Sequence, residues 1–406
     1  MMTSRERVRM ALRHQEPDKV PIDFGGMRST GISAMAYNKL KEYLGIKGGV
    51  TKLYDIQQQL AEPELEIVDM MGGDVVQLHR LEPSFGIKID RWKPGKLPDG
   101  SDCIEPYDLN PVVNEKGGLD IKAGDTVIAT MPKGGYYYDV VYHAYENVET
   151  KEDIDKLPVP VITDEELEYL RKEAKRLYET TDKAILGAFG GNIFEMGQVE
   201  WGYEKYFSML ALEPELMHYY HQRLADAWLV ALERYLGAVG EYIDVIQFGD
   251  DLGTQLNSQI SVDMYREMIK PYHKVQYQYV RKNYPNVKVF LHCCGAIYNL
   301  IPDLIDAGVE VLNPVQLSAK GMDPVRLKQE FGKDLVFWGA GCNTQTTATF
   351  GTVDEVAAEV EKYMKIFAPG GGFVFTQIHN IQVNVPPENV VAIYETAKKF
   401  RNYPVV

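Results

Sequence analysis

The chain has 406 residues, of which 45% are hydrophobic and 25% are charged, a composition typical of a globular protein. Its formal net charge of -15 argues against binding to nucleic acids or anionic membranes, because both require a basic face. The four cysteines are too few and too unevenly spaced for a disulfide framework, and they favour a reducing compartment. No apolar segment approaches the roughly 20 residues of a membrane span. We therefore expect a cytoplasmic protein that binds neither nucleic acid nor membrane.

The first elements alternate between helix and strand. Thr3 offers an N-cap hydroxyl to an amphipathic helix that runs to about Arg13. Residues 19–26 are predicted to form a strand that ends in a glycine turn, with Asp23 where such a strand presents a side chain to a site. Capping of the following turn is an equally good role for Asp23. Helical segments are then predicted at 33–44, around 53–60 and at 63–71, followed by a strand at 74–78.

Residues 82–147 differ in sequence pattern from the segments before them. Glycines, prolines and short alternating runs, such as 87–92 and 126–129, replace the helical periodicity. This pattern predicts an antiparallel β insertion rather than a separate domain.

The second half returns to strands followed by helices. Strands are predicted at 184–187, 242–248, 287–291, 309–313, 335–338 and 373–375, and helices at 165–178, 199–212, 214–236, 261–284, 297–307, after 323, at 353–367 and after 387. About eight such repeats indicate a parallel sheet with right-handed crossovers. We expect one α/β domain over residues 1–406, a (β/α)8 TIM barrel with the β insertion in its first half. The alternative is a doubly wound sheet.

In such folds the functional site forms at the carboxyl ends of the strands. Polar side chains occupy those positions throughout this chain. Five of them are candidates for substrate binding, either at a strand end or in the turn that follows it: Asp23, Arg28, Asn192, Gln316 and Asn343. Asp250 and Asp251 follow the strand at 242–248, where one could act as acid or base, orient a ligand or complete a metal shell. The alternative for one of the pair is to cap the next segment.

The strand at 287–291 runs into His292, Cys293, Cys294 and Gly295. Alternate side chains of an extended chain share a face, so His292 and Cys294 point together while Cys293 points away. A histidine and a thiol side by side suit Zn²⁺. The alternative is two core cysteines beside a hydrogen-bonded histidine. Four candidate metal ligands come from three strand ends that a barrel brings around one mouth: His292, Cys294, Cys342 and His379.

Taken together, four motifs make the chain resemble the uroporphyrinogen decarboxylase superfamily. They are Arg5 to Pro21 with its closing Val-Pro, the turn Gly249-Asp250-Asp251, His292-Cys293-Cys294-Gly295, and the stretch from Ile378-His379-Asn380 to Pro387-Glu388-Asn389. The resemblance covers nearly the whole chain. It implies a (β/α)8 barrel and either of two activities, decarboxylation of porphyrinogens or zinc-dependent methyl transfer with a corrinoid protein.

Two departures favour the methyltransferase branch. The decarboxylases share an amino-terminal Gln-Ala-Gly-Arg-Tyr run, whereas the comparable residues 24–29 here read Phe-Gly-Gly-Met-Arg-Ser and keep only a displaced Arg28. The methyltransferases carry His-x-Cys at the strand end, which His292 and Cys294 match. Their third ligand is a cysteine before a Pro-x-Glu-Asn helix start, and His379 holds that position here. Cys342, in an earlier loop, is the other candidate for the third ligand.

The resemblance therefore implies a zinc-dependent methyltransferase that moves a methyl group between a small molecule and a corrinoid (cobalamin). The small molecule could be a thiol, a methyl ether or a methylamine. No corrinoid-binding segment is evident, so a separate partner protein would carry that cofactor. One alternative is a metal-free decarboxylase that recognises its substrate through Arg28, Arg80 and Asp23. Another is a non-catalytic corrinoid-binding accessory protein. The sequence allows a homo-oligomer and does not choose among oligomeric states.

Overall fold

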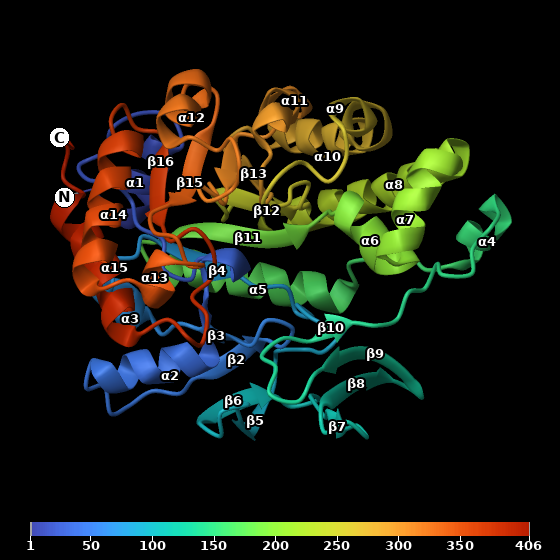
Figure 1. Ribbon diagram of the computed structural model, residues 1–406, viewed down its shortest axis with the longest axis horizontal. Coiled ribbons are helices and arrows are strands. Elements are labelled where there is room, and N and C mark those ends of the chain that lie inside the picture. Colours follow the sequence, from blue (N-terminus) through green and yellow to red (C-terminus); the bar gives the residue numbers. More distant parts are fainter. Residues whose placement is uncertain (1, 406) are drawn as a thin grey trace.

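The computed structural model describes residues 2–405 and has an α/β architecture built around one curled parallel sheet (Figure 1). The order of its seven strands is β16-β15-β14-β13-β12-β11-β4. Every neighbouring pair is parallel, so crossovers must join consecutive strands. The strands are β4 (Val75–Leu78), β11 (Ala184–Gly190), β12 (Val245–Gly249), β13 (Lys288–His292), β14 (Val311–Asn313), β15 (Val336–Ala340) and β16 (Phe373–Thr376).

Residues 20–24, part of the strand predicted at 19–26, lie between the two edge strands of this sheet. The Phe375 amide in β16 donates to the Pro21 carbonyl at 2.9 Å, and the Asp74 amide, just before β4, donates to the Ile22 carbonyl at 2.7 Å. The segment makes one parallel bridge, from Ile22 to Phe375, rather than a full ladder. It thus joins the edges of the curled sheet and makes the fold TIM-barrel-like.

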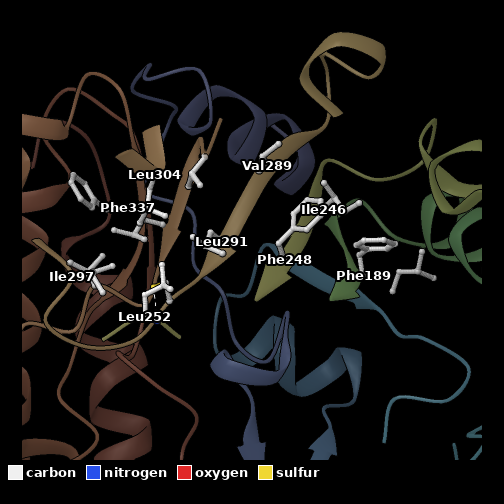
Figure 2. Packing of buried hydrophobic residues seen from close by; sticks show 14 of the residues in the cluster. Phe189, Ile246, Phe248, Leu252, Val289, Leu291, Ile297, Leu304 and Phe337 are labelled. Atoms are coloured by element: carbon white, nitrogen blue, oxygen red, sulfur yellow. Dashed lines mark hydrogen bonds between the residues drawn. The ribbon is translucent and has the colours of Figure 1, made fainter. Parts of the chain in front are cut away.

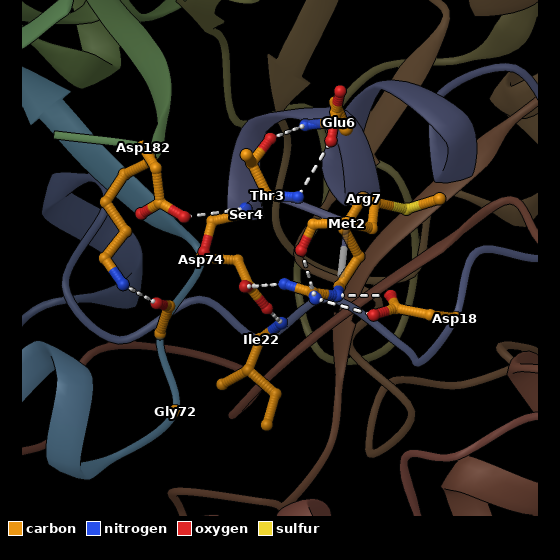
Figure 3. A network of polar contacts seen from close by, with 12 residues as sticks. Met2, Thr3, Ser4, Glu6, Arg7, Asp18, Ile22, Gly72, Asp74 and Asp182 are labelled. Atoms are coloured by element: carbon orange, nitrogen blue, oxygen red, sulfur yellow. Dashed lines mark hydrogen bonds and ion pairs between the residues drawn. The ribbon is translucent and has the colours of Figure 1, made fainter. Parts of the chain in front are cut away.

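An ion-pair network of buried Arg7, Asp74 and Arg401 with exposed Asp18 holds this junction in place (Figure 3). Arg7 in the first helix donates to Asp18 at 2.7 Å and to Asp74 at 2.6 Å. The second carboxylate oxygen of Asp74 accepts the Ile22 amide at 3.0 Å, and Asp74 also pairs with Arg401. Paired charges of this kind are tolerated in the interior because each has its partners. The network connects both ends of the chain to the start of β4.

The helices surround the sheet (Figure 1). They are α1 (Ser4–Ala11), α2 (Ala34–Tyr43), α3 (Leu65–Met70), α4 (Lys151–Lys156), α5 (Asp164–Thr180), α6 (Phe194–Trp201), α7 (Tyr203–Leu212), α8 (Pro214–Val239), α9 (Val262–Met264), α10 (Lys270–Asn283), α11 (Ile301–Ala307), α12 (Pro324–Phe331), α13 (Thr347–Phe350), α14 (Val353–Phe367) and α15 (Pro387–Phe400). Thr3 caps α1 in a capping box with Glu6, as the sequence predicts. None of these helices combines the length and the apolar character needed to cross a bilayer.

Strand alternation divides the core into two layers. Val245, Phe290 and Val311 belong to a small cluster inside the curled sheet. Their chain neighbours Ile246, Val289 and Leu312 belong instead to the larger cluster between the sheet and the helices, part of which Figure 2 shows. Successive residues of a strand point to opposite faces, so both faces of these strands are buried.

Two further sheets lie on one side of the parallel sheet (Figure 1). The first contains β1 (Ile32–Ser33), β2 (Lys52–Asp55), β3 (Leu60–Glu62), β5 (Trp92–Lys96) and β6 (Asp102–Pro106). The second is antiparallel and contains β7 (Val112–Val113), β8 (Leu119–Ala123), β9 (Thr126–Met131) and β10 (Asp139–Val140). Strands β5 to β10 fall within the residues 82–147 for which the sequence predicts β structure.

Three predicted helices differ in the structure. Residues 53–60 form the end of β2, a turn at 56–59 and the start of β3, because the two strands pair with each other and β3 also pairs with β1. The helix predicted at 199–212 is divided between α6 and α7 at Gly202, whose φ of 77° does not continue a helix. The helix predicted at 261–284 contains a π-helical turn at Tyr265–Ile269 next to Pro271, which cannot donate a helical hydrogen bond.

Candidate functional site

Polar side chains form a layer at the carboxyl ends of the parallel strands. Three of these side chains line one cavity: Gln77, Gln247 and His292. Each lies two residues after an apolar residue of the small cluster inside the curled sheet. Because side chains alternate along a strand, these three point toward the inside of the curled sheet, next to the apolar cluster there. This layer is the floor of the candidate site.

His292, Cys294 and His379 form a group whose ligand atoms all lie within 4.8 Å of one another. Cys294 Sγ is 3.3 Å from His292 Nε2, and the two imidazole rings are 5.8 Å apart. His292 ends β13, whereas His379 lies in the loop after β16, on the opposite side of two intervening strands. The structure thus brings together three of the four predicted metal ligands.

Buried asparagines orient both histidines. Asn313 Oδ1 lies 2.7 Å from His292 Nδ1, and Asn313 Nδ2 donates to the Trp338 carbonyl at 2.8 Å. Asn380 Oδ1 lies 3.0 Å from His379 Nδ1, and its Nδ2 donates to a glutamine side chain. Each amide presents its oxygen to Nδ1 of the ring, an arrangement in which Nδ1 donates and Nε2 is the nitrogen available to a metal.

Burial, with His292 next in importance, lowers the pKa of His379 to about 4. His379 is therefore neutral at physiological pH, as a metal ligand must be. Burial, with Asp251 next, raises the pKa of the Cys294 thiol well above its usual range. A cation bound beside the sulfur would favour the thiolate.

The two adjacent cysteines face different surroundings. Cys293 is fully buried, and its sulfur accepts the Leu252 amide at 3.4 Å. Cys294 is partly exposed and lies beside His292. The alternation predicted from the sequence is present at these positions.

Asp250 and Asp251 also point in different directions. Asp250 is fully buried and accepts the amides of Ile193, Phe194 and Glu195 at 2.6–2.8 Å. It also contacts His273 Nε2 at 2.6 Å. Its carboxylate therefore caps α6, which precedes it in the chain, rather than the following segment that the sequence suggested, and it does not line the cavity.

Asp251 lines the cavity beside the metal-ligating group. It accepts the Cys294 amide at 2.7 Å, and its carboxylate lies 3.8 Å from His292 Nε2. Glu195, near the start of α6, lines the same cavity and accepts a hydrogen bond from Asn192 Nδ2 at 2.8 Å. Burial, followed by Asp251 and Asp250, raises the pKa of Glu195 well above its usual range.

The cavity has a volume of about 270 Å³. It is lined mainly by polar side chains and contains few apolar ones. Besides the residues above, its walls include Arg28, Ser29, Tyr54, Asp55, Gln58, His79, Arg80, Phe189 and Asn192. Arg28 and Asn192, both predicted to bind substrate, are among the residues that line the cavity, and their role stays a prediction.

Four other predicted residues lie elsewhere. The Cys342 sulfur contacts Glu359 of α14 at 3.4 Å and is outside the metal-ligating group. Its strand ends at Ala340, whose φ of 59° interrupts the alternation that would have carried Cys342 to the inner face. Cys342 is therefore not placed as the third ligand.

The remaining three are structural in this arrangement, and none lines the cavity. Asp23 is fully buried and accepts from the Gly26 amide at 2.6 Å and from Trp338 Nε1 at 2.8 Å. Gln316 accepts the Gly295 amide at 2.8 Å. Asn343 accepts the Gln345 amide at 2.9 Å in the loop after β15.

Glu195, Asn313 and Asn380 are polar residues at strand ends in the sequence, but none of them was assigned a role in the site. Asn313 lies on β14 at the same level as His292, as their pairing in the sheet shows. An inward asparagine at a strand end is the signal that identifies it. Glu195 carries the same strand-end signal as Asn192, because both follow β11, but its orientation depends on how Asp250 caps α6.

Comparison with known proteins gives two kinds of relative. Residues 140–400 match the model of the family described as uroporphyrinogen decarboxylase (URO-D). A uroporphyrinogen decarboxylase from Chlorobium limicola is 25% identical over 401 residues, 96% of each chain. One from Pelodictyon phaeoclathratiforme is 29% identical over 266 residues, 62% of this chain and 70% of that protein.

Among solved structures, a methyltransferase from Methanosarcina mazei superposes with a TM-score of 0.62. It is 19% identical in sequence, and the match covers 98% of this chain and 99% of that one. At this level of identity the similarity establishes a common fold.

Proposed function

The chain belongs to the uroporphyrinogen decarboxylase family, and we propose that within this family it is a zinc-dependent methyltransferase. It would move a methyl group between a small molecule and a corrinoid carried by a separate protein. The observation that carries the proposal is the convergence of His292, Cys294 and His379 beside a cavity of about 270 Å³.

The donor set fits zinc. Two imidazoles and one thiol are ligands that Zn²⁺ prefers, and three protein ligands leave one position for a substrate. Asn313 and Asn380 supply the partners that orient metal-ligating histidines through their other ring nitrogen. A zinc ion bound here would polarise the heteroatom that carries or receives the methyl group, whether that atom is a thiol sulfur, an ether oxygen or an amine nitrogen.

The chain's own residues would position the substrate and manage its proton. Asp251 lies next to both His292 and Cys294, so its carboxylate can orient a substrate held beside the metal ligands or hold a proton. Arg28 and Asn192 belong to the same wall and would contact the rest of the substrate. Asp250 would act indirectly, because it fixes the first turn of α6 and with it Glu195.

Metal-free decarboxylation is the second candidate, and the sequence identity of 25% to a decarboxylase over 96% of the chain favours it. That reaction on a carboxylated pyrrole would need basic groups free to bind carboxylates. Arg28, however, pairs with Asp55, and Arg80 pairs with Glu166. Asp23, the third residue of that hypothesis, is buried away from the cavity.

The test is metal analysis of freshly purified protein together with the cobalt spectrum of a corrinoid protein mixed with candidate methyl donors. We expect about one zinc per chain and a spectral change that a chelator abolishes. Zinc-free protein, or decarboxylase activity that a chelator leaves intact, would contradict the proposal.

A further inference from the structure

We propose that Tyr137, in the β insertion, is a positioning residue for the candidate metal site and acts on His379 through Asn380. The inference rests on the metal site of the proposed function and gives the β insertion a part in it. Tyr137 lies in the loop between β9 and β10, 243 residues before Asn380 in the chain. Its side chain nevertheless contacts the loop after β16, which carries His379.

Asn380 is the residue on which these contacts converge. Its side chain is fully buried, its Oδ1 lies 3.0 Å from His379 Nδ1, and its Nδ2 donates to Gln58 Oε1 at 2.7 Å. If the amide were turned by half a rotation, its NH2 group would donate to Nδ1, and the proton of the neutral ring would lie on Nε2. Nε2 would then lack the lone pair that a metal needs. The direction of the Asn380 amide therefore decides whether His379 can act as a ligand.

Tyr137 favours the direction that leaves the ligand nitrogen free. Gln382 Nε2 donates to the Tyr137 hydroxyl at 2.6 Å and also to Asn380 Oδ1. Since the hydroxyl oxygen accepts from Gln382, its own hydrogen is directed toward Asn380 Oδ1, 3.4 Å away. Two donors on this side are matched by the oxygen of the Asn380 amide and not by its NH2 group. Tyr137 thus acts on Asn380 directly and also by holding Gln382 in place.

The insertion does not depend on this hydroxyl for its own position. The Tyr138 amide donates to the Gln57 carbonyl at 2.9 Å, in the turn between β2 and β3. Further along, the Tyr145 amide donates to the Glu200 carbonyl of α6 at 2.8 Å. Both are backbone hydrogen bonds, so they remain when a side-chain hydroxyl is removed. Tyr137→Phe therefore keeps the ring and removes only the hydrogen-bonding group.

The experiment measures the zinc affinity of metal-stripped full-length protein by competition with a chromophoric chelator. Tyr137→Phe should bind zinc about tenfold more weakly than the parent, because the partners that orient a ligating histidine contribute on this order. Tyr136→Phe is the matched control, since the neighbouring ring is 41% exposed, and it should bind zinc as the parent does. Equal zinc affinity in Tyr137→Phe and the parent would overturn the inference.

A double-mutant cycle tests whether Tyr137 acts through Asn380. Asn380→Ala should weaken zinc binding by itself, and Tyr137→Phe added to it should reduce the affinity no further. If the two effects multiply instead, Tyr137 acts by another route and the inference is wrong.

The absorption spectrum of the cobalt(II)-substituted protein provides the test if Asn380→Ala fails to fold. The ligand-field bands of cobalt report the geometry of its ligands, so Tyr137→Phe should change them and Tyr136→Phe should not. A purely structural role would lower the urea midpoint of the metal-free protein and leave the bands as they are in the parent. Unchanged bands would contradict the inference.

The two proposals can fail separately. Protein that transfers methyl groups and binds zinc equally well with and without the Tyr137 hydroxyl would retain the proposed function and overturn the role of Tyr137. Protein whose zinc affinity depends on Tyr137 but that transfers no methyl group to or from a corrinoid would support the positioning role and overturn the methyltransferase. Parent protein that binds no zinc would overturn both.

Discussion

The side-chain oxygen of Asn313 lies 2.7 Å from Nδ1 of His292, on the neighbouring strand. This contact holds the imidazole so that Nε2 faces Cys294 and the cavity. Asn313→Ala would free the ring to rotate, and we expect zinc affinity to fall by roughly 10–100-fold. Competition with a chromophoric chelator measures the change. Asn343→Ala, in the loop after β15, is the matched control and should bind zinc as the parent protein does.

The two neighbouring thiols should differ in their effect on the metal. Cys294→Ala removes a sulfur that lies 3.3 Å from His292 Nε2, so zinc content should fall toward zero. Cys293→Ala truncates a fully buried side chain and should cost about 1 kcal/mol of stability while keeping the metal. Elemental analysis and urea unfolding measure the two effects. Similar zinc content in both variants would show that the assignment is incorrect.

His379, rather than Cys342, should act as the third ligand. The Cys342 sulfur contacts Glu359, whereas His379 belongs to the group with His292 and Cys294. We therefore expect His379→Ala to lose zinc and Cys342→Ala to retain it. Loss of zinc in Cys342→Ala alone would mean that the loop after β15 rearranges when the metal binds.

Substitution of Asp250 should lower mainly the stability of the fold, whereas substitution of Asp251 should lower mainly the activity. Asp250→Ala leaves three backbone amides and His273 without their acceptor, so unfolding free energy should fall by roughly 3–5 kcal/mol. Asp251→Asn should cost little stability but lower methyl transfer by about 100-fold. Urea unfolding and a methyl-transfer assay on both variants measure the contrast. Equal effects of the two substitutions would contradict it.

Glu200 should make stability depend on pH. Burial raises its pKa from 4.5 to about 7, although Tyr220 donates to its carboxylate at 2.6 Å. Between these two values the folded chain keeps a proton that the unfolded chain has lost, so this contribution to stability declines as the pH rises toward about 7. Glu200→Gln should remove that decline, and Glu204→Gln should not. Urea unfolding at several pH values between 5 and 8 tests this.

Local patterns predicted most of the framework. Thr3 and Glu6 indicated the start of α1, and the apolar run before His292 indicated β13. Errors arose where strand pairing, or one residue such as Pro271, outweighs local helical periodicity. Residues 53–60 pair with other strands instead of forming a helix, and the single helix expected at 261–284 contains a π-helical turn.

The sequence by itself determined the family, the order of strands and helices, and the shared face of His292 and Cys294. The family follows from the resemblance of four motifs. The elements and the shared face follow from local periodicity, because residues two apart on a strand point the same way whatever surrounds them. Only the tertiary structure decided that His379 joins them, that Asp250 caps α6 while Asp251 faces the cavity, and that Arg28 is already paired. Those relations depend on the paths of loops between distant strand ends, and one residue such as Ala340, with its positive φ, is enough to turn Cys342 away.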